Sequence, residues 1–182
     1  MEPNSSSPSD LPDGVRIEPA TARDVPLILS LIKALAEYER LAHDVVATEA
    51  DIQASLFGAT PHAEAIIARS VSVHGRHAAE ADGSEAVGFA VWFQSYSTFL
   101  SRPGLYLEDL FVLPAWRDRG IGRALLRHLA RIAIERDCGR MEWSVLDWND
   151  PAIGFYRKIG ARAMDEWTVY RLAGDALRRV AR

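Results

Sequence analysis

Apolar and polar residues follow two different periods along this chain, and each period predicts a kind of element. Apolar side chains recur at helical spacing over residues 25–35 and again over about 119–137. Two Thr-x-x-Asp capping boxes precede helical patterns, at Thr21 with Asp24 and at Thr48 with Asp51. We therefore expect one helix after each capping box and a longer main helix over about 119–137.

Strand-like runs separate these helices. Two runs rich in β-branched and aromatic residues, 63–73 and 86–96, flank a polar loop, which is typical of a β-hairpin with a longer turn. Further strands are expected over 105–114, 140–148 and 161–172, besides a short one from Val15.

A last helical pattern lies between the final two predicted strands. Over residues 149–160, Asn149 is suited to the N-cap, Pro151 to the first turn and Gly160 to the C-terminal stop. A short tail helix is expected over 173–182. The alternation of strands and helices predicts one mixed α/β domain over residues 15–182, after a polar, disordered leader over 1–14.

Composition narrows the class of protein. Of 182 residues, 48% are hydrophobic and 25% charged, and the net charge is -4, so general attraction to nucleic acid or anionic membrane is not indicated. A single cysteine, Cys138, excludes an intramolecular disulfide and a cysteine zinc cluster, and the histidines lack paired metal spacing. No run reaches the roughly 20 apolar residues of a membrane span. We expect a cytoplasmic protein without a metal.

The stretch "AWRDRGIGRALL" predicts an anion site. It joins a strand to the main helix, and its glycines, Gly120 and Gly122, allow a ligand to approach the free N–H groups of a helix start. Three arginines add positive charge: Arg117, Arg119 and Arg123. The alternative is a loop whose glycines serve only tight packing.

Two common nucleotide motifs are excluded at this loop. A Walker A motif requires Lys followed by Ser or Thr after the second glycine, and Arg123 and Ala124 stand there. The dinucleotide fingerprint requires a third glycine at the position of Leu125.

The pattern Arg117-x-x-Gly120-x-Gly122 does resemble the R/Q-x-x-G-x-G/A motif of the GNAT N-acetyltransferases. The resemblance extends over residues 15–172 in element order. It implies an α/β (α+β) GNAT-type domain, with a mixed, mostly antiparallel sheet of about six or seven strands and about four flanking helices. It also implies acetyl-CoA as co-substrate. Asp118 departs from the glycine that many members carry there.

Three longer blocks are similar to the diamine acetyltransferase branch, which includes the spermidine/spermine and thialysine enzymes: "RIEPATARDVPLILSLIKALAEYER", "LYLEDLFVLPAWRDRGIG" and "VLDWNDPAIGFYRKIGA". This likeness implies direct acetyl transfer, in a ternary complex, to a diamine, a polyamine or a lysine-like amino acid. It also implies a homodimer. The last predicted strand departs from the branch, because "MDEWTVYRL" lacks a glycine and has a shorter loop.

The resemblance assigns residues to three roles. Tyr156 would be the general acid, and Glu108 would bind the amine and accept its proton. The acetyl-CoA set is Leu110, Phe111, Val112, Arg117, Asp118, Arg119, Gly120, Ile121, Gly122, Arg123, Asn149, Pro151, Ala152, Tyr156 and Lys158. The acceptor set is Tyr38, Glu39, Glu108, Glu142, Trp143, Ser144 and Glu166.

Structural alternatives remain for several of these residues. Tyr156 could be a core tyrosine, Asn149 a pure N-cap, and Tyr38 with Glu39 a solvated helix end. Glu108 could be an acid that merely lies at a sheet edge. Strand alternation sends Glu108 and Asp109 to opposite faces unless a bulge intervenes, and Asp109 could be a structural hydrogen-bonding partner. Two rival functions also remain: modification of a protein or peptide amine, and a non-catalytic acetyl-CoA-binding module.

Overall fold

The structure is a computed structural model, and it describes residues 11–71 and 84–182. The chain divides into two compact units, residues 1–144 and 145–182, and each is described by itself. The leader predicted over 1–14 lies mostly outside the described residues, and so does most of the predicted hairpin loop.

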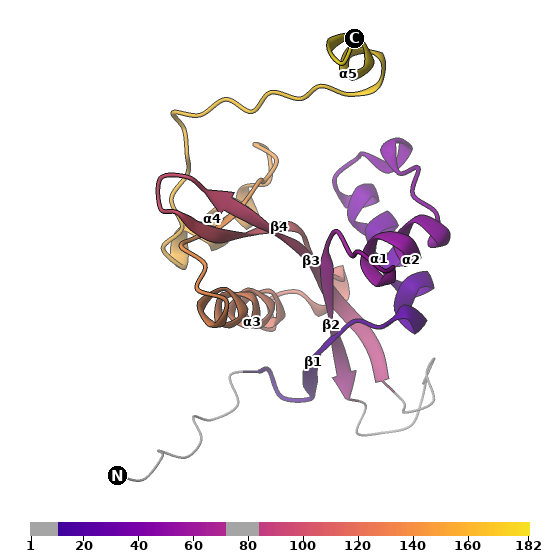
Figure 1. Ribbon diagram of the computed structural model, residues 1–182. Coiled ribbons are helices and arrows are strands. Elements are labelled where there is room, and N and C mark those ends of the chain that lie inside the picture. Colours follow the sequence, from indigo (N-terminus) through magenta and orange to yellow (C-terminus); the bar gives the residue numbers. More distant parts are fainter. Residues whose placement is uncertain (1–10, 72–83) are drawn as a thin grey trace. The chain divides into compact units, whose positions relative to one another are not determined.

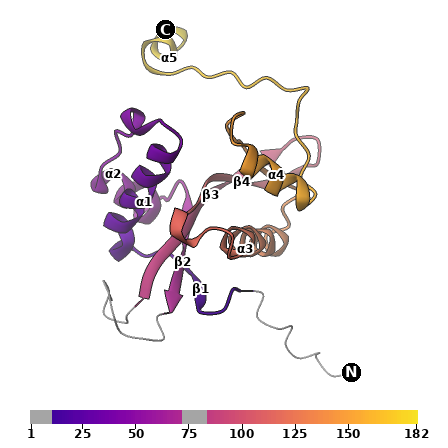
Figure 2. The ribbon, with the colours of Figure 1, turned by 180° about the vertical axis from the view of Figure 1, so that it is seen from behind.

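The first unit is built on one sheet. Its strands are β1 (Val15–Pro19), β2 (Glu64–Val71), β3 (Ser84–Ser97), β4 (Arg102–Val112) and β5 (Met141–Trp143). They lie in the order β1-β2-β3-β4-β5, with the first four antiparallel and β5 parallel to β4. Figures 1 and 2 label the four antiparallel strands. The predicted hairpin is confirmed, because β2 pairs with β3. The mixed, mostly antiparallel sheet is confirmed as well.

Three α-helices of the first unit begin where the sequence predicts. They are α1 (Val25–Tyr38), α2 (Glu49–Phe57) and α3 (Ile121–Glu135). Short 3-10 turns are η1 (Ala22–Asp24), η2 (Ala42–Asp44) and η3 (Pro114–Trp116). Both capping boxes form: the Thr21 N–H donates to Asp24 Oδ2 at 2.7 Å and the Thr48 N–H donates to Asp51 Oδ2 at 2.9 Å.

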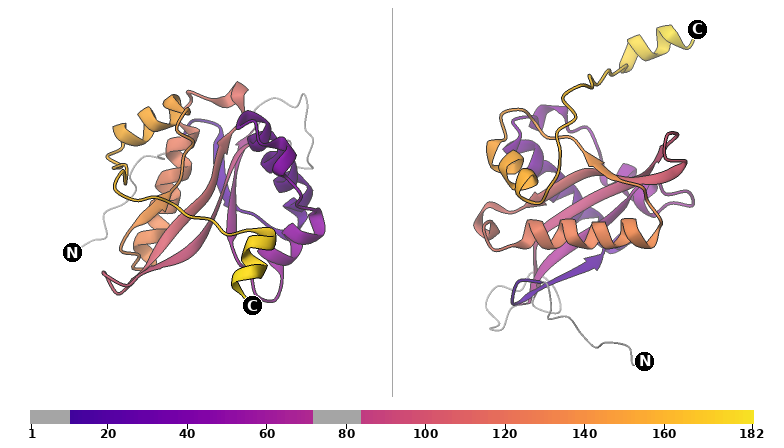
Figure 3. Two further views of the ribbon diagram at one scale, coloured as in Figure 1. Left: turned by 90° about the horizontal axis from the view of Figure 1, so that it is seen from above. Right: turned by 90° about the vertical axis from the view of Figure 1, so that its left-hand side faces the viewer.

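Helices cover both faces of this sheet. Helices α1 and α2 lie on one face and α3 lies on the other (Figure 3). The core beneath α1 and α2 contains fully buried Ile28, Ile67 and Phe89, and Phe111 of β4 belongs to it. Helix α3 contributes buried Ile121, Leu125 and Leu129, in the periodic pattern that predicted it.

The second unit contains α4 (Asp150–Lys158) and α5 (Gly174–Val180). Asn149 is buried and caps α4, since its Oδ1 accepts a hydrogen bond from the Ala152 N–H at 3.4 Å. Pro151 lies in the first turn, and Gly160 follows the helix with φ of 89°. The predicted boundaries of this helix are confirmed.

The number of strands is lower than predicted. The described residues form five strands, whereas six or seven were expected, and five α-helices where about four were expected. Strand β5 is only three residues long because it pairs with β4 over Leu105–Leu107 alone. Residues 161–173 form no strand, although their side chains alternate suitably. Alternating apolar and polar side chains indicate a preference for extended backbone. A strand forms only where that backbone also has a hydrogen-bonded neighbour.

Candidate active site

The glycine-rich loop opens α3 with free backbone donors. Gly120 is the N-cap of α3 with φ of 80°, and no side chain caps this helix start. The first N–H groups of a helix have no partner four residues back, and the helix dipole favours negative charge there. A side chain added at Gly122 would meet only the Val112 Cγ2 atom, at 3.9 Å. The loop is therefore open to an anion.

Asp118 occupies a position that favours glycine. Its φ is 60°, in the left-handed region, where side chains other than those of Asn and Asp are strained. This backbone requirement accounts for the glycine at the corresponding position of the motif. Asp118 lies between Arg117 and Arg119 in this loop.

We expect Gly120→Ala to lower the free energy of unfolding by about 1 kcal/mol, because alanine is strained at positive φ. The added Cβ meets only Pro12 Cγ, at 3.7 Å, so the loss is conformational and not steric. Urea unfolding measures it. Gly122→Ala is the matched control, since Gly122 lies in helical backbone, and we expect it to be neutral or stabilising. Equal stability of Gly120→Ala and wild type would contradict the assignment.

The far end of β4 has an open edge. Strand β4 pairs with β3 as far as Val112, but with β5 only over Leu105–Leu107. The backbone of Leu110–Val112 therefore has no β5 residue beside it on the side away from β3. An extended ligand can hydrogen-bond to such an edge as an added strand would.

A β-bulge brings two carboxylates of β4 to one side of the sheet. Asp109 pairs with Val91, while Leu107 pairs with Trp92, so Glu108 is the extra residue. A bulge interrupts the alternation of side chains. Asp109 therefore shares the face of its partner Val91, which belongs to the core beneath α1. Because Glu108 is the extra residue of the bulge, its side chain lies on the same side of the sheet as that of Asp109.

The acidic residues of this face affect one another. The pKa of Asp109 is raised to about 6, mainly by burial and further by the negative charges of Glu108 and Glu39. Burial also raises the pKa of Glu39, which directly follows α1. Glu39 after α1 and Glu108 and Asp109 on β4 thus lie close enough for the charges of the first two to affect Asp109, and these three carboxylates are the acidic cluster. Ionised carboxylates attract a cation, and a bound cation in turn lowers their pKa values and keeps them ionised.

Tyr38 and Arg117 lie against each other beside this cluster. The Arg117 guanidinium carbon lies 4.2 Å from the centroid of the Tyr38 ring and 5.7 Å from that of Phe111. Its Nε donates to the Val112 carbonyl oxygen at 3.2 Å. The end of α1, the end of β4 and the glycine loop are therefore joined through one side chain.

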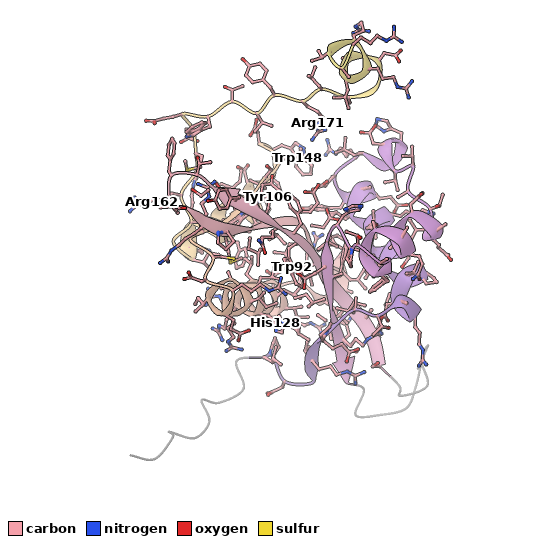
Figure 4. All side chains as sticks on the ribbon, viewed as in Figure 1. Trp92, Tyr106, His128, Trp148, Arg162 and Arg171 are labelled. Carbon is pink, nitrogen blue, oxygen red and sulfur yellow. The ribbon has the colours of Figure 1, made fainter. Side chains whose placement is uncertain are left out.

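The residues assigned on β5 meet β4. The Glu142 carboxylate pairs with Arg140 Nε at 2.7 Å, so it is partly neutralised. The Tyr106 hydroxyl, labelled in Figure 4, lies 2.9 Å from Ser144 Oγ. The Tyr106 ring stacks on Phe93 with centroids 5.0 Å apart. Trp143 pairs with Leu107 in the parallel ladder.

The remaining assigned residues belong to the second unit. Pro151, Ala152, Tyr156 and Lys158 lie on α4, after the Asn149 cap. The Tyr156 ring lies 5.5 Å from the ring of Phe155. Glu166 lies in the exposed segment without regular structure. The geometry of the acidic cluster and of the glycine loop is therefore that of the first unit alone.

A hollow of about 340 Å³ in the first unit lies elsewhere. Trp92 and His128 line it (Figure 4), together with residues from the end of β1 and from α2. Arg136 and Glu64, which also line it, form a two-pronged ion pair. None of the residues assigned from the sequence motifs lines this hollow, so it is separate from the candidate site.

Within residues 11–71 and 84–182, no helix is both long enough and apolar enough to cross a bilayer. The same residues contain no group of three or more His, Cys, Asp or Glu side chains arranged to hold a metal ion.

A bulged antiparallel strand that leads into a glycine-rich helix start is the arrangement expected of a GNAT-type domain, the class that the sequence motif indicates. The chain belongs to the GNAT acetyltransferase family. The family model described as "Acetyltransferase (GNAT) family" matches residues 36–161. The expected family, fold class and enzyme class, an N-acetyltransferase, are thereby confirmed.

Two similar proteins are named as N-acetyltransferases, and a solved structure shares the fold. A thialysine N-epsilon-acetyltransferase of Bos taurus is 36% identical over 170 residues, which are 92% of this chain and 97% of that protein. An L-ornithine N5-acetyltransferase of Arabidopsis thaliana is 33% identical, over 98% of this chain and 94% of its own. A solved integron cassette protein of V. cholerae superposes with a TM-score of 0.71 at 28% identity, covering 92% of this chain and 98% of its own.

Two residues near the candidate site could not be placed from the sequence. Asp109 was left between a structural and a functional role, because alternation alone does not reveal the bulge at Glu108. Tyr106 was not assigned, although its hydroxyl is within hydrogen-bond distance of Ser144. The sequence offers one signal for Tyr106: it is an aromatic residue two positions before the Glu108–Asp109 pair on the same predicted strand.

Proposed function

We propose that this protein transfers the acetyl group of acetyl-CoA to the primary amine of a small cationic acceptor. The observation that carries the proposal is the acidic cluster, two of whose carboxylates, Glu108 and Asp109, lie on the strand that leads into the glycine loop. The acceptor class is a diamine, a polyamine or a lysine-like amino acid. Relatives named for thialysine and L-ornithine support this class, since both compounds carry a side-chain amine besides an α-amino group.

The acidic cluster suits the first chemical requirement of the reaction. An alkylammonium has a pKa near 10.4, so only on the order of one in a thousand is nucleophilic at neutral pH. Glu108 and Asp109 attract the ammonium, and Glu108 accepts its proton directly or through water. Removal of the proton inside the site exposes the nitrogen lone pair where the acceptor is held.

The residues of the loop and of β4 fit acetyl-CoA. The uncapped start of α3, with Gly120, Ile121, Gly122 and Arg123, suits a pyrophosphate, and Arg119 adds charge. The edge of β4 at Leu110–Val112, where the Val112 carbonyl oxygen accepts a hydrogen bond from Arg117, suits an extended amide-bearing arm. Asn149 and the first turn of α4 are proposed as further contacts. When bound, acetyl-CoA supplies an acetyl thioester, and Tyr156 donates a proton to the departing sulfur.

We also propose that the protein is a homodimer. The described segment 164–172 exposes large apolar side chains, including Trp167 at 69% and Tyr170 at 92%. Apolar side chains gathered in this way are typical of surfaces that bind another chain. Light scattering of the purified protein tests this assembly, and a monomer at assay concentration would contradict it.

We expect acidification to weaken acceptor binding with a midpoint near pH 6. The pKa of Asp109 is raised to about 6, so its carboxylate is ionised above that pH and neutral below it. A neutral Asp109 no longer attracts an ammonium, and kcat/KM for the amine should therefore fall as the pH drops below about 6. The pH profile of kcat/KM measures this, and Asp109→Asn should remove the inflection.

The same shift has a consequence for stability. Between its ordinary value of 3.8 and about 6, Asp109 holds a proton in the folded state that it has lost in the unfolded state. Its contribution to the free energy of unfolding therefore decreases as the pH rises through this window. Asp109→Asn should abolish that dependence. An identical pH dependence of stability in variant and wild type would contradict the role of burial.

An acceptor panel tests the proposed function. Release of free thiol from acetyl-CoA is followed with spermidine, putrescine, thialysine, lysine, diaminobutyrate and a peptide pool. We expect turnover with at least one small cationic amine and none, or far less, with peptides. Turnover with peptides alone would indicate a protein acetyltransferase. Tight binding of acetyl-CoA without turnover on any amine would indicate a non-catalytic module.

A further inference from the structure

Arg117 is the first residue of the glycine motif, yet its side chain turns back toward α1. Its guanidinium carbon lies 4.2 Å from the Tyr38 ring centroid, within the range of a cation–π contact. Phe111 lies on a second side, at 5.7 Å. The Nε donor is used by the Val112 carbonyl oxygen at 3.2 Å. Two rings and one backbone acceptor therefore determine where this guanidinium lies.

The three contacts connect parts of the site with different tasks. Tyr38 is the last residue of α1 and directly precedes Glu39 of the acidic cluster. Phe111 and Val112 end β4, shortly after Asp109. The Tyr38 and Phe111 rings are themselves 6.4 Å apart, so Arg117 lies against an aromatic pair. Displacement of Arg117 would remove support from the helix end that carries Glu39.

Arg119, in the same loop, behaves differently. Its guanidinium carbon lies 4.6 Å from the ring of Trp116, which belongs to the loop itself. The guanidinium of Arg119 thus lies within the segment before α3, whereas that of Arg117 lies against residues of α1 and β4. Two arginines with the same chemistry, two residues apart, are held against different partners.

We propose that Arg117 is a positioning residue for the acceptor, acting through Tyr38, and not chiefly a ligand of the pyrophosphate. The inference rests on the proposed function, because it assigns the Tyr38–Glu39 end of α1 to the amine. Arg117 fixes the Tyr38 ring, and the ring in turn fixes the position of Glu39 beside Glu108 and Asp109. Binding of the amine therefore depends on Arg117 more than binding of acetyl-CoA does.

The test compares Arg117→Gln, Arg117→Lys and Arg119→Gln. We expect Arg117→Gln to raise the KM of the amine about tenfold, while the Kd of acetyl-CoA from calorimetry changes by less than about twofold. Arg117→Lys keeps a cation over the Tyr38 ring and should recover part of the loss. Arg119→Gln removes an arginine–aromatic contact from the same loop and should instead weaken acetyl-CoA binding. A general loss of folding would affect the KM of the amine and the Kd of acetyl-CoA together, so it would not give opposite results for the Arg117 and Arg119 variants.

A double-mutant cycle tests whether Tyr38 carries the effect. Tyr38→Leu should raise the KM of the amine by itself and add little in the Arg117→Gln background, because both changes remove the same contact. Tyr38→Phe keeps the ring and should preserve the coupling. Additive effects of Arg117→Gln and Tyr38→Leu would overturn the proposal. So would a weakened Kd for acetyl-CoA with an unchanged KM for the amine.

Failure of the proposed function would be recognised separately. If the wild-type protein binds acetyl-CoA but acetylates no amine in the panel, the proposed function is wrong. The contact between Arg117 and Tyr38 is then tested by the same cycle on thermal unfolding midpoints. Non-additive midpoints would support an energetic coupling between Arg117 and Tyr38. Additive midpoints would overturn the proposed role of Arg117 as well as the proposed function.

Discussion

Replacement of Tyr156 by phenylalanine is expected to lower kcat about 100-fold and to leave the Kd of acetyl-CoA nearly unchanged. The substitution removes only the phenolic hydroxyl and keeps the ring in the apolar pattern of α4. General acid catalysis by a positioned side chain contributes roughly 10²- to 10⁴-fold, so loss of the proton donor affects the chemical step. Steady-state kinetics with saturating amine measures kcat, and calorimetry measures acetyl-CoA binding.

Tyr96→Phe is a matched control for this experiment. Tyr96 is 61% exposed, and its hydroxyl lies 3.3 Å from Ser101 Oγ at the far end of β3. Its removal should leave kcat unchanged. If Tyr156→Phe retains kcat within about twofold of wild type, the tyrosine is a packing residue and the departing thiolate is protonated by another group.

Glu108→Gln should lower kcat/KM for the amine about 100-fold. Glutamine preserves the shape of the side chain but has neither the charge that attracts the ammonium nor the basicity that accepts its proton. The bulge at Glu108 also depends on backbone pairing, which this substitution does not alter. We expect kcat to fall together with kcat/KM, because proton removal precedes acetyl transfer.

Glu85→Gln controls for the loss of one negative charge from the same sheet. Glu85 is exposed on β3, where it pairs with Ser70, and it is not part of the acidic cluster. Its activity should match that of wild type. A decrease confined to the KM of the amine in Glu108→Gln, with kcat intact, would limit Glu108 to substrate binding and assign proton removal to another group.

Much of the fold follows from local sequence signals. The capping boxes at Thr21 and Thr48 and the Asn149 cap are contacts between residues three positions apart, so a sequence displays both partners at once. The buried face of α3 likewise reflects the period of its own residues. The glycine loop was recognisable because Gly120 needs positive φ, which few other residues adopt without strain.

The rest depends on partners that are distant in sequence. The length of β5 is determined by its pairing with Leu105–Leu107, and nothing in its own residues shows where that pairing stops. The bulge at Glu108 arises from register with β3, so the direction of Asp109 was left open. Arg117 resembles a phosphate ligand in the motif, but its contact with Tyr38 spans 79 positions of the sequence and is visible only in three dimensions.

Transfer of the acetyl group to a small cationic amine is tested most directly by mass spectrometry of a single reaction. In it, wild-type protein and acetyl-CoA are mixed with the amine panel and the peptide pool together. We expect a singly acetylated small amine as the main product, modified at a primary amino group, and loss of that product in Glu108→Gln. Acetylated peptides as the main product, or an acetylated amine formed equally by Glu108→Gln, would contradict it.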